Sequence, residues 1–306
     1  MRKPLVIVVT GPTGSGKTAF SIRLAKKLNC SIISADSRQV FKEIPIGSAA
    51  PTNEELNEVK HYLVGSHSIN DKFNAGVFEK EALKILESLF KENNIQLVCG
   101  GTGLYIKALL EGLDNIPDSS DEIRTELDEI WESDPEVLKK QLQELDPEYS
   151  KITDLSNKQR VIRALEVIQL SGKTYSSFRK SSQKARDFDY VILAMELPRE
   201  ELYQRINRRS ELMIEAGWIK EARNVFPFRE VNALQTVGFR ELFEFFDGRL
   251  SQEEAIEKIK INTRRYAKRQ LTWIRNQQEV SWVNPEIETE SVIKIIKDRF
   301  SLDELS

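Results

Sequence analysis

The chain has 306 residues, with 45 Lys and Arg against 48 Asp and Glu, and its formal net charge is −3. This length permits one large hydrophobic core, or a core and a smaller domain, and a hydrophobic content of 40% argues against extensive disorder. The apolar run at residues 5–9 is too short for a bilayer helix or a signal peptide, so we expect a cytoplasmic protein. The chain has two cysteines, Cys30 and Cys99, and two histidines, and these do not have the spacing of a structural zinc site. We therefore expect the cysteines to be reduced thiols.

Strands and helices alternate over the first third of the chain. Residues 5–10 form an apolar run that predicts a buried strand, and a glycine-rich turn and an amphipathic helix follow it. Further strands and helices are predicted at 31–35, 62–64, 77–90, 95–99 and 104–110. This alternation predicts an α/β fold with a doubly wound parallel sheet of the P-loop type, which binds ligands at the carboxyl ends of its strands.

The pattern changes near residue 115. Residues 115–186 are charged and helical in pattern, and they contain no clear strand. A strand is predicted again at 190–197, followed only by helices from residue 199 onward. We therefore assign residues 1–114 and 187–306 to an α/β catalytic core with C-terminal helices, and residues 115–186 to an inserted all-helical domain.

Basic residues are concentrated in two segments. Residues 167–186 contain five bases and no acid, and residues 258–278 contain seven bases and no acid. By contrast, residues 114–148 contain thirteen acids and three bases. Such segments allow a chain of nearly neutral net charge to bind a polyanion.

A glycine-rich loop follows the first predicted strand and matches G-x-x-x-x-G-K-[ST] in full. In such a loop, backbone N–H groups converge on phosphate oxygens and the following helix adds its positive end. Lys17 would supply a charge to the terminal phosphates, and Thr18 a hydroxyl to Mg²⁺. The predicted phosphate-binding residues are Gly11, Pro12, Thr13, Gly14, Ser15, Gly16, Lys17 and Thr18.

Two further segments follow predicted strands on the same edge of the sheet. Asp36 could bind Mg²⁺ through water, act as a general base, or cap the following turn. Thr102, after two glycines, could place a hydroxyl near the phosphates, and it could also cap the next helix. The loop residues alone leave open whether the phosphates are transferred or expelled.

The last long helix has two predicted faces. Ile256, Ile259, Tyr266 and Ile274 are expected to face the core. The pairs Arg264 and Lys268, and Arg265 and Arg269, are each four residues apart and therefore project from neighbouring faces. We expect these bases to contact an RNA backbone, although a solvated amphipathic helix is the alternative.

The order of these motifs resembles that of the tRNA dimethylallyltransferases, in their short bacterial-type form. Beyond the P-loop, the resemblance rests on residues 33–41, 46–49, 100–105, 157–167, 171–173, 236–240 and 263–273, so that it covers roughly residues 5–275. Phe41, Ser48 and Ala50 depart from the family pattern, in which Tyr, Thr and Lys are common at these positions.

The resemblance implies an enzyme that transfers a dimethylallyl group from dimethylallyl diphosphate to N6 of the adenosine 3′ of the anticodon, position 37 of tRNA, and releases diphosphate. It implies Mg²⁺ as the cofactor and the tRNA anticodon stem-loop as the partner, with no membrane; we expect a monomer. The implied catalytic residues are Asp36 as base, Lys17, Thr18 and Thr102, with Thr18 on the metal. The implied tRNA contacts are Asp36, Ser37, Arg38, Gln39, Thr102, Arg124, Gln159, Arg160, Val161, Ile162, Arg163, Gln235, Gly238, Phe239, Arg240, Arg264, Arg265, Lys268 and Arg269.

Some alternatives remain. An adenylate isopentenyltransferase would keep the loop but usually lacks the inserted domain, and a small-molecule P-loop kinase would make no use of a basic C-terminal helix. A GTPase-like RNA-binding module is disfavoured, because the chain has no N-K-x-D segment to read guanine. For Arg124, which lies in an acidic stretch, an internal salt bridge is an equal alternative to RNA contact.

Overall fold

The computed structural model describes residues 3–179, 184–277 and 279–300. Part of the first basic segment, residues 180–183, and residue 278 in the second lie outside the described residues. The chain divides into two compact units, residues 112–184 and the remainder.

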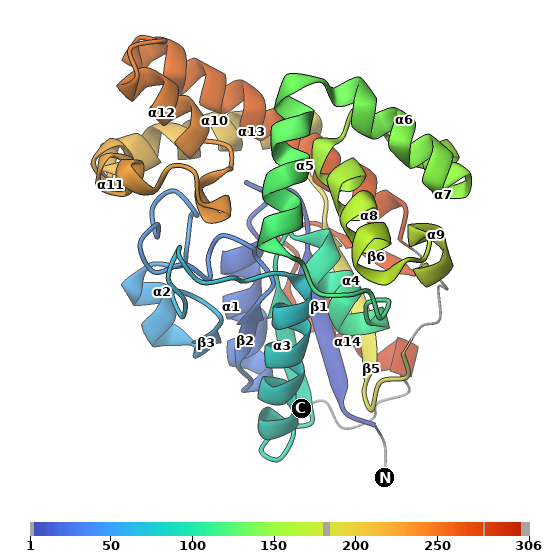
Figure 1. Ribbon diagram of the computed structural model, residues 1–306. Coiled ribbons are helices and arrows are strands. Elements are labelled where there is room, and N and C mark those ends of the chain that lie inside the picture. Colours follow the sequence, from blue (N-terminus) through green and yellow to red (C-terminus); the bar gives the residue numbers. More distant parts are fainter. Residues whose placement is uncertain (1–2, 180–183, 278, 301–306) are drawn as a thin grey trace. The chain divides into compact units, whose positions relative to one another are not determined.

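A parallel sheet forms the centre of the larger unit (Figure 1). In the described part of this unit the strand order is β3-β2-β4-β1-β5-β6, with every neighbouring pair parallel, which confirms the predicted α/β class. All residues of β1 are buried, as expected for a central strand covered on both faces. The strands are β1 (Leu5–Thr10), β2 (Ile32–Ser34), β3 (His61–Tyr62), β4 (Ile95–Cys99), β5 (Asp189–Met195) and β6 (Val280–Val283).

Helices cover both faces of the sheet. α1 (Lys17–Leu28) and α14 (Thr289–Phe300) share one apolar cluster with the strands, in which Phe20 and Ile296 pack with Ile7. α3 (Ala75–Leu89) and α4 (Gly103–Glu111) pack together on the other face (Figure 1). The short helix α2 (Asn53–Glu58) precedes β3 and begins with a capping box from Thr52.

The strand β6 corrects the sequence analysis, which predicted only helices after residue 199. Val280–Val283 pairs in parallel with β5 and extends the sheet by one edge strand. Only Val283 of its four residues is buried, so the segment has little of the apolar pattern by which a strand is predicted. Pairing with β5, rather than local propensity, determines its conformation.

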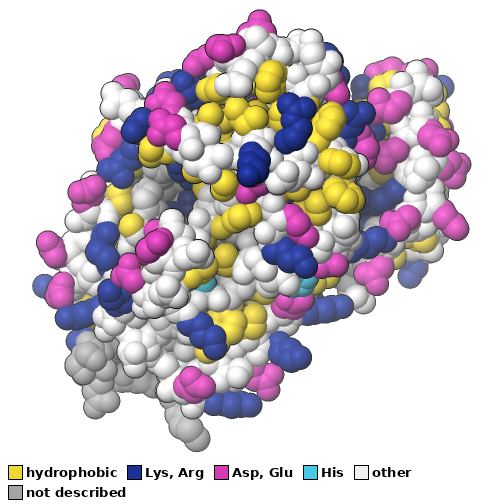
Figure 2. All heavy atoms as spheres, turned by 90° about the vertical axis from the view of Figure 1, so that its left-hand side faces the viewer, with side chains coloured by type: hydrophobic (Ala, Val, Ile, Leu, Met, Phe, Trp, Pro, Cys, Tyr) yellow, Lys and Arg dark blue, Asp and Glu magenta, His cyan; other side chains and the backbone are white. Residues whose placement is uncertain are grey.

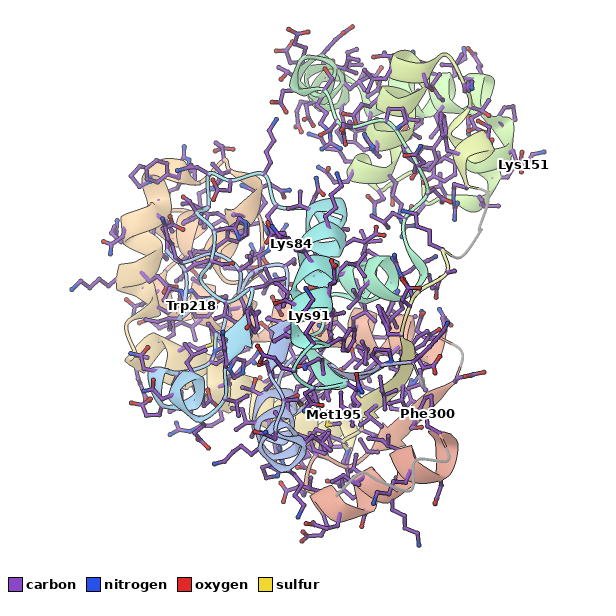
Figure 3. The ribbon with its side chains drawn as sticks, turned by 90° about the horizontal axis from the view of Figure 1, so that it is seen from below. Lys84, Lys91, Lys151, Met195, Trp218 and Phe300 are labelled. Carbon is purple, nitrogen blue, oxygen red and sulfur yellow. The ribbon has the colours of Figure 1, made fainter. Side chains whose placement is uncertain are left out.

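A layer of helices lies at the carboxyl ends of the strands (Figure 1). Trp218 is in the apolar cluster of this layer, whereas Met195 is in the sheet core; Figure 3 shows both. On the face seen in Figure 2, basic and acidic side chains are interspersed. The layer consists of α10 (Arg199–Glu215), α11 (Trp218–Val225), η1 (Phe226–Phe228), η2 (Asn232–Leu234), α12 (Phe239–Phe246) and α13 (Gln252–Arg275).

The smaller unit contains helices and connecting loops, with no strand among its described residues. Leu138, Leu142, Val161 and Leu165 form the centre of its own apolar core. Side-chain oxygens of Ser120, Asp134, Asp146 and Asn157 accept hydrogen bonds at the starts of four of its helices. These helices are α5 (Asp121–Ser133), α6 (Pro135–Leu145), α7 (Pro147–Ile152), α8 (Lys158–Ser171) and α9 (Tyr175–Phe178).

Within the described ranges, no helix combines the length and apolarity that crossing a membrane requires.

Candidate active site

The glycine-rich loop leads from β1 into α1, and two of its glycines have left-handed backbone angles. Gly14 has φ of 82° and Gly16 of 84°, a conformation that is strained for residues with a side chain. Gly16 is the N-cap of α1 and provides no side-chain hydrogen bond to the first turn. The amino end of α1, with Lys17 and Thr18, lines a cavity of about 420 Å³. Its backbone N–H groups and positive helix end are therefore suited to hold an anion there.

The ammonium of Lys17 lies inside this loop. Its Nζ donates hydrogen bonds to the carbonyl oxygens of Gly11, at 3.0 Å, and Pro12, at 2.9 Å. The pKa of Lys17 is lowered to about 8, chiefly because burial removes the ammonium from water. Cys99 and Asp36 partly offset this effect, and the positive charge of Arg209 adds to it. An anion bound in the loop would favour the protonated form of Lys17, which burial disfavours.

Asp36 and Thr102 come together at the ends of the neighbouring strands β2 and β4. Oδ1 of Asp36 accepts hydrogen bonds from the backbone N–H of Arg38, at 2.9 Å, and from that of Gln39, at 3.4 Å. Oγ1 of Thr102 accepts from the backbone N–H of Ser37 at 3.0 Å, which leaves its hydroxyl proton for another acceptor. The two strand ends are in close contact, since a Cβ on Gly100 would lie 2.2 Å from the Ala35 carbonyl oxygen.

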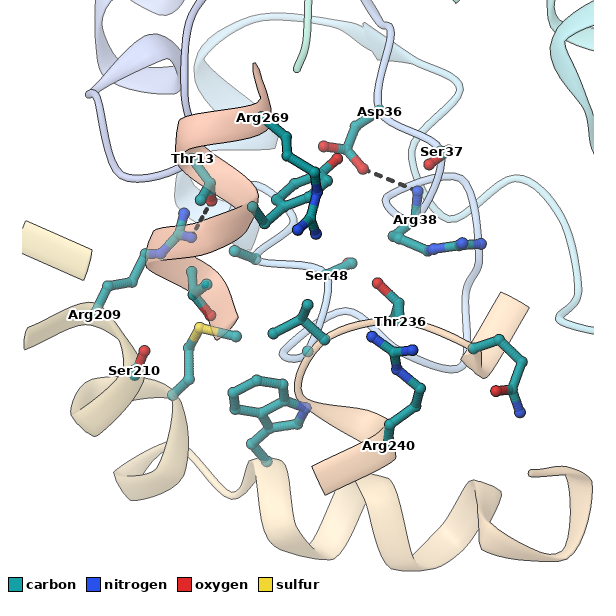
Figure 4. Close-up of a pocket in the computed structure, with 18 residues that line it drawn as sticks. Thr13, Asp36, Ser37, Arg38, Ser48, Arg209, Ser210, Thr236, Arg240 and Arg269 are labelled. Carbon is teal, nitrogen blue, oxygen red and sulfur yellow. Dashed lines mark hydrogen bonds between the residues drawn. The ribbon is translucent and has the colours of Figure 1, made fainter. Parts of the chain in front are cut away.

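Four arginines surround a second cavity of about 260 Å³ beside Asp36, as Figure 4 shows. Burial lowers the pKa of Arg38 and of Arg209, and the carboxylate of Asp36 opposes this effect on both. Arginine stays protonated in proteins, so the cavity combines several positive charges with one carboxylate. These arginines are Arg38, Arg209, Arg240 and Arg269.

Arg209 and Gln270 are site residues that the sequence reasoning did not assign. Arg209, on α10, donates a hydrogen bond to Oγ1 of Thr13 (Figure 4), and Gln270, on α13, bonds to the backbone of Thr13 and Gly101. Arg209 lies in a helix with several other arginines, and no local pattern distinguishes it. Gln270 falls within a segment that carries the family resemblance, which was the available signal.

The residues around the loop are compatible with Mg²⁺. The hydroxyl of Thr18 and the carboxylate of Asp36 line the same cavity, and both are hard oxygen donors of the kind that Mg²⁺ prefers. The described residues contain no group of three or more His, Cys, Asp or Glu side chains that could hold a metal ion. Mg²⁺ bound here would therefore take most of its ligands from phosphate and water, as is usual at phosphate sites.

Helix α13 presents a mixed face to the site. Tyr266 does not face the core as predicted: it is 36% exposed and lines both cavities, because Ala267 and Gln270 occupy the buried side. Arg264 is partly engaged within the protein, donating to Oδ1 of Asn207 at 2.6 Å. Among the predicted RNA contacts on this helix, Arg265, Lys268 and Arg269 are exposed, and they stay predictions.

The start of α12 contains two residues that were predicted to contact tRNA but that pack inside the protein. Phe239 is fully buried against Trp218, and a Cβ on Gly238 would lie 2.1 Å from Cζ2 of that indole. The side chain of Phe239 therefore cannot reach an RNA, and Gly238 has none. Gln235 and Arg240 are exposed and line the cavity beside Asp36.

The predicted tRNA contacts of the helical unit also divide into buried and exposed residues. Val161 and Ile162 were predicted to contact tRNA, but they are 0% and 2% exposed in the core of this unit, so that prediction is wrong for their side chains. Gln159 and Arg160 are exposed at the start of α8.

Arg124 and Arg163 instead bind one carboxylate inside the unit. Nε of Arg124 donates to Oε1 of Glu166 at 3.0 Å, and Nη1 of Arg163 donates to Oε2 at 2.7 Å. The Glu166 side chain is fully buried, and its Oε1 also accepts from the backbone N–H of Ser120. The internal salt bridge considered for Arg124 is thus present, and Arg163 shares it.

Known proteins match the chain over most of its length. A family model described as IPP transferase matches residues 39–277. The tRNA dimethylallyltransferase of Cytophaga hutchinsonii is 50% identical over 281 residues, which are 92% of each chain. The tRNA dimethylallyltransferase 1 of Bacteroides thetaiotaomicron is 45% identical over 288 residues, which are 94% of each chain.

Solved structures agree with these relatives. The full-length tRNA isopentenylpyrophosphate transferase from Bacillus halodurans superposes with a TM-score of 0.70 at 34% identity, covering 98% of this chain and 96% of that one. A eukaryotic dimethylallyltransferase acting on tRNA superposes with a TM-score of 0.79 at 28% identity, covering 97% of this chain and 80% of that one. The chain therefore belongs to the IPP transferase family, whose members include the tRNA dimethylallyltransferases.

Proposed function

We propose that this enzyme transfers the dimethylallyl group of dimethylallyl diphosphate to N6 of adenosine 37 in tRNA and releases diphosphate. The observation that carries the proposal is the convergence of a phosphate-binding loop, a carboxylate and a threonine hydroxyl at one edge of the sheet, beside a cavity lined by arginines. The names of the relatives support tRNA as the acceptor.

Asp36 is the proposed base. The N6 lone pair of adenine is delocalised into the ring, so the amine attacks well only if a base takes its proton as the new bond forms. As N6 bonds to C1 of the allyl group, the bond from C1 to the diphosphate oxygen breaks, and its electron pair leaves with the diphosphate. Oδ1 of Asp36 is held by backbone N–H groups, so Oδ2 is the oxygen assigned to the proton.

The leaving diphosphate is assigned to the glycine-rich loop. Lys17 would exchange its carbonyl partners for phosphate oxygens, Thr102 would donate its free hydroxyl proton, and Arg209 would add a charge from α10. Donors preorganised in this way are worth roughly 3 kcal/mol each in the transition state. Thr18 would hold Mg²⁺, which supplies further positive charge against the developing negative charge of the leaving group.

The tRNA contacts are assigned to exposed arginine, lysine and glutamine side chains. Taking the target base out of the anticodon stack costs a few kcal/mol, and phosphate contacts can offset this cost. The proposed contacts are Arg265, Lys268 and Arg269 on α13, Gln235 and Arg240 beside the cavity, and Gln159 and Arg160 on the helical unit. Because the loop, base and hydroxyl all come from one chain, we propose that a monomer is active, in the cytoplasm where tRNA is modified.

One labelling experiment tests the proposal against its alternatives. The full chain is incubated with Mg²⁺ and radiolabelled dimethylallyl diphosphate, together with unmodified tRNA, the same tRNA with guanosine at position 37, or AMP. We expect label only in the first tRNA. Label in AMP alone would favour an adenylate isopentenyltransferase. In a parallel incubation with ATP labelled in its γ-phosphate, release or transfer of that phosphate without prenyl transfer would favour a kinase. Label retained by the guanosine variant would contradict the assigned target.

A further inference from the structure

The side-chain amide of Gln270 is bonded at both ends to loops from different strands. Its Oε1 accepts from the backbone N–H of Thr13 at 2.8 Å, and its Nε2 donates to the carbonyl oxygen of Gly101 at 2.9 Å. One partner is a donor and the other an acceptor, so the orientation of the amide is fixed. Glutamine supplies both groups, whereas a carboxylate could serve only the Thr13 side.

Helix α13 packs closely against the loop that follows β4, residues 100–103. A Cβ on Gly101 would lie 2.2 Å from Nε2 of Gln270, and a Cβ on Gly103 would lie 2.3 Å from Cδ2 of Trp273. Gln270 and Trp273 are three residues apart and share one face of the helix. Gln270 is only 8% exposed, so water does not readily replace its partners.

Hydrogen bonds extend from Gln270 to both halves of the proposed chemistry. On one side, Thr13 belongs to the loop assigned to the diphosphate. On the other side, Gly101 precedes Thr102, whose Oγ1 accepts from the N–H of Ser37, next to Asp36. Gln270 therefore connects the phosphate-binding loop directly to the loop that contains Gly101 and Thr102, and through Thr102 to the segment that contains Asp36. The proposed function assigns Gln270 no contact with the substrate.

We propose that Gln270 is a positioning residue, which sets the alignment of the leaving diphosphate relative to Asp36 through Thr13 and Gly101. The proposal rests on the function proposed above and goes beyond it by giving the alignment to a residue of α13. A displacement of about 1 Å between reacting groups can cost about a hundredfold in rate. Loss of Gln270 should therefore lower kcat while leaving the affinity for the donor largely intact.

The test uses the full chain with Gln270→Leu and Gln270→Glu, and Gln277→Leu as the matched control. Gln277 donates from its Nε2 to the carbonyl oxygen of Trp273 just beyond the same helix, and it has no part in the proposed site. Gln270→Glu keeps the size of the side chain and the acceptor for Thr13 but cannot donate to Gly101, so it separates the hydrogen bond from the packing. We expect kcat to fall at least about tenfold in both Gln270 variants, with KM for dimethylallyl diphosphate within about threefold of the wild type and Gln277→Leu nearly unchanged.

Amide hydrogen exchange gives a second readout that does not depend on activity. We expect faster exchange at residues 11–16 and 100–103 in Gln270→Leu but not in Gln277→Leu. Wild-type kcat in either Gln270 variant, a loss confined to KM, or unchanged exchange would overturn the proposal. If the wild type transfers no dimethylallyl group to tRNA while exchange in both loops still depends on Gln270, the proposed function fails and only the structural connection is retained.

Discussion

Arg163 donates a hydrogen bond to Glu166 over 2.7 Å, one turn away on the same helix of the smaller unit. Glu166 is fully buried, and Arg124 binds its other oxygen. We predict that Glu166→Ala destabilises the helical unit by about 1–3 kcal/mol, because the Ser120 N–H and two partly buried guanidinium groups lose their common acceptor. Hydrogen exchange of residues 112–179 in the full chain measures this, with Glu132→Ala as an exposed control that loses only a surface ion pair. Equal protection in both variants would contradict it.

A second prediction concerns Arg160, which is exposed on the same helix. If Arg160 contacts RNA phosphate, Arg160→Ala weakens tRNA binding and reduces the slope of log affinity against log salt by about 0.7. Stability should stay within about 0.5 kcal/mol of the wild type, since the side chain is at the surface. Filter binding over a salt series, with thermal unfolding in parallel, checks both expectations. An unchanged salt slope would remove Arg160 from the interface.

For Lys17 we predict a kinetic loss. Lys17→Ala should lower the rate of dimethylallyl transfer by about a hundredfold or more under saturating donor, because a preorganised charge is removed from the leaving group. Single-turnover transfer to tRNA measures the chemical step, and binding of tRNA serves as the control because it should be unaffected. A rate near that of the wild type would refute the assignment of this loop to diphosphate.

The lowered pKa of Lys17 predicts a pH dependence for diphosphate affinity. With a pKa of about 8, the lysine loses its proton as the pH rises through 8, whereas an ordinary lysine, at 10.5, would keep it. Diphosphate binds the charged form, so its affinity should fall by up to about tenfold per pH unit above that pKa. Calorimetric titration from pH 7 to 9 measures the diphosphate affinity of the wild type and of Lys17→Arg. The ratio of the two affinities at each pH removes the contribution of the ionisation of diphosphate itself. A constant ratio would contradict the prediction.

The fold class and the phosphate loop could be predicted because their signals are local. An apolar run followed by G-x-x-x-x-G-K-[ST] specifies strand, loop and helix within the first 28 residues, and these elements lie where the pattern places them. Asp36 and Thr102 could be placed at one sheet edge because both directly follow strands that the sequence identifies.

What sequence reasoning missed depends on contacts between distant segments. Arg209 and Gln270 reach Thr13 from helices about 200 and 260 residues further along the chain, and no local pattern reports such a contact. Tyr266 was assigned to the core by helical spacing, but α13 buries smaller residues there and turns Tyr266 to the cavities. Helical spacing shows that residues share a face but does not show what that face contacts.

The contact of Gly100 with Ala35 also limits how this site can change in evolution. Any side chain on Gly100 would collide with the Ala35 carbonyl carbon and oxygen, at 2.3 and 2.2 Å, and both of these are backbone atoms that cannot rotate away. Gly100 therefore cannot be substituted without displacing the backbone of Ala35. Variation remains open at Ser48 and Ala50, which are only partly buried at the cavity edge and depart from the family pattern. Substitutions are therefore expected to be tolerated along that edge of the cavity and excluded at the strand ends that meet at Gly100.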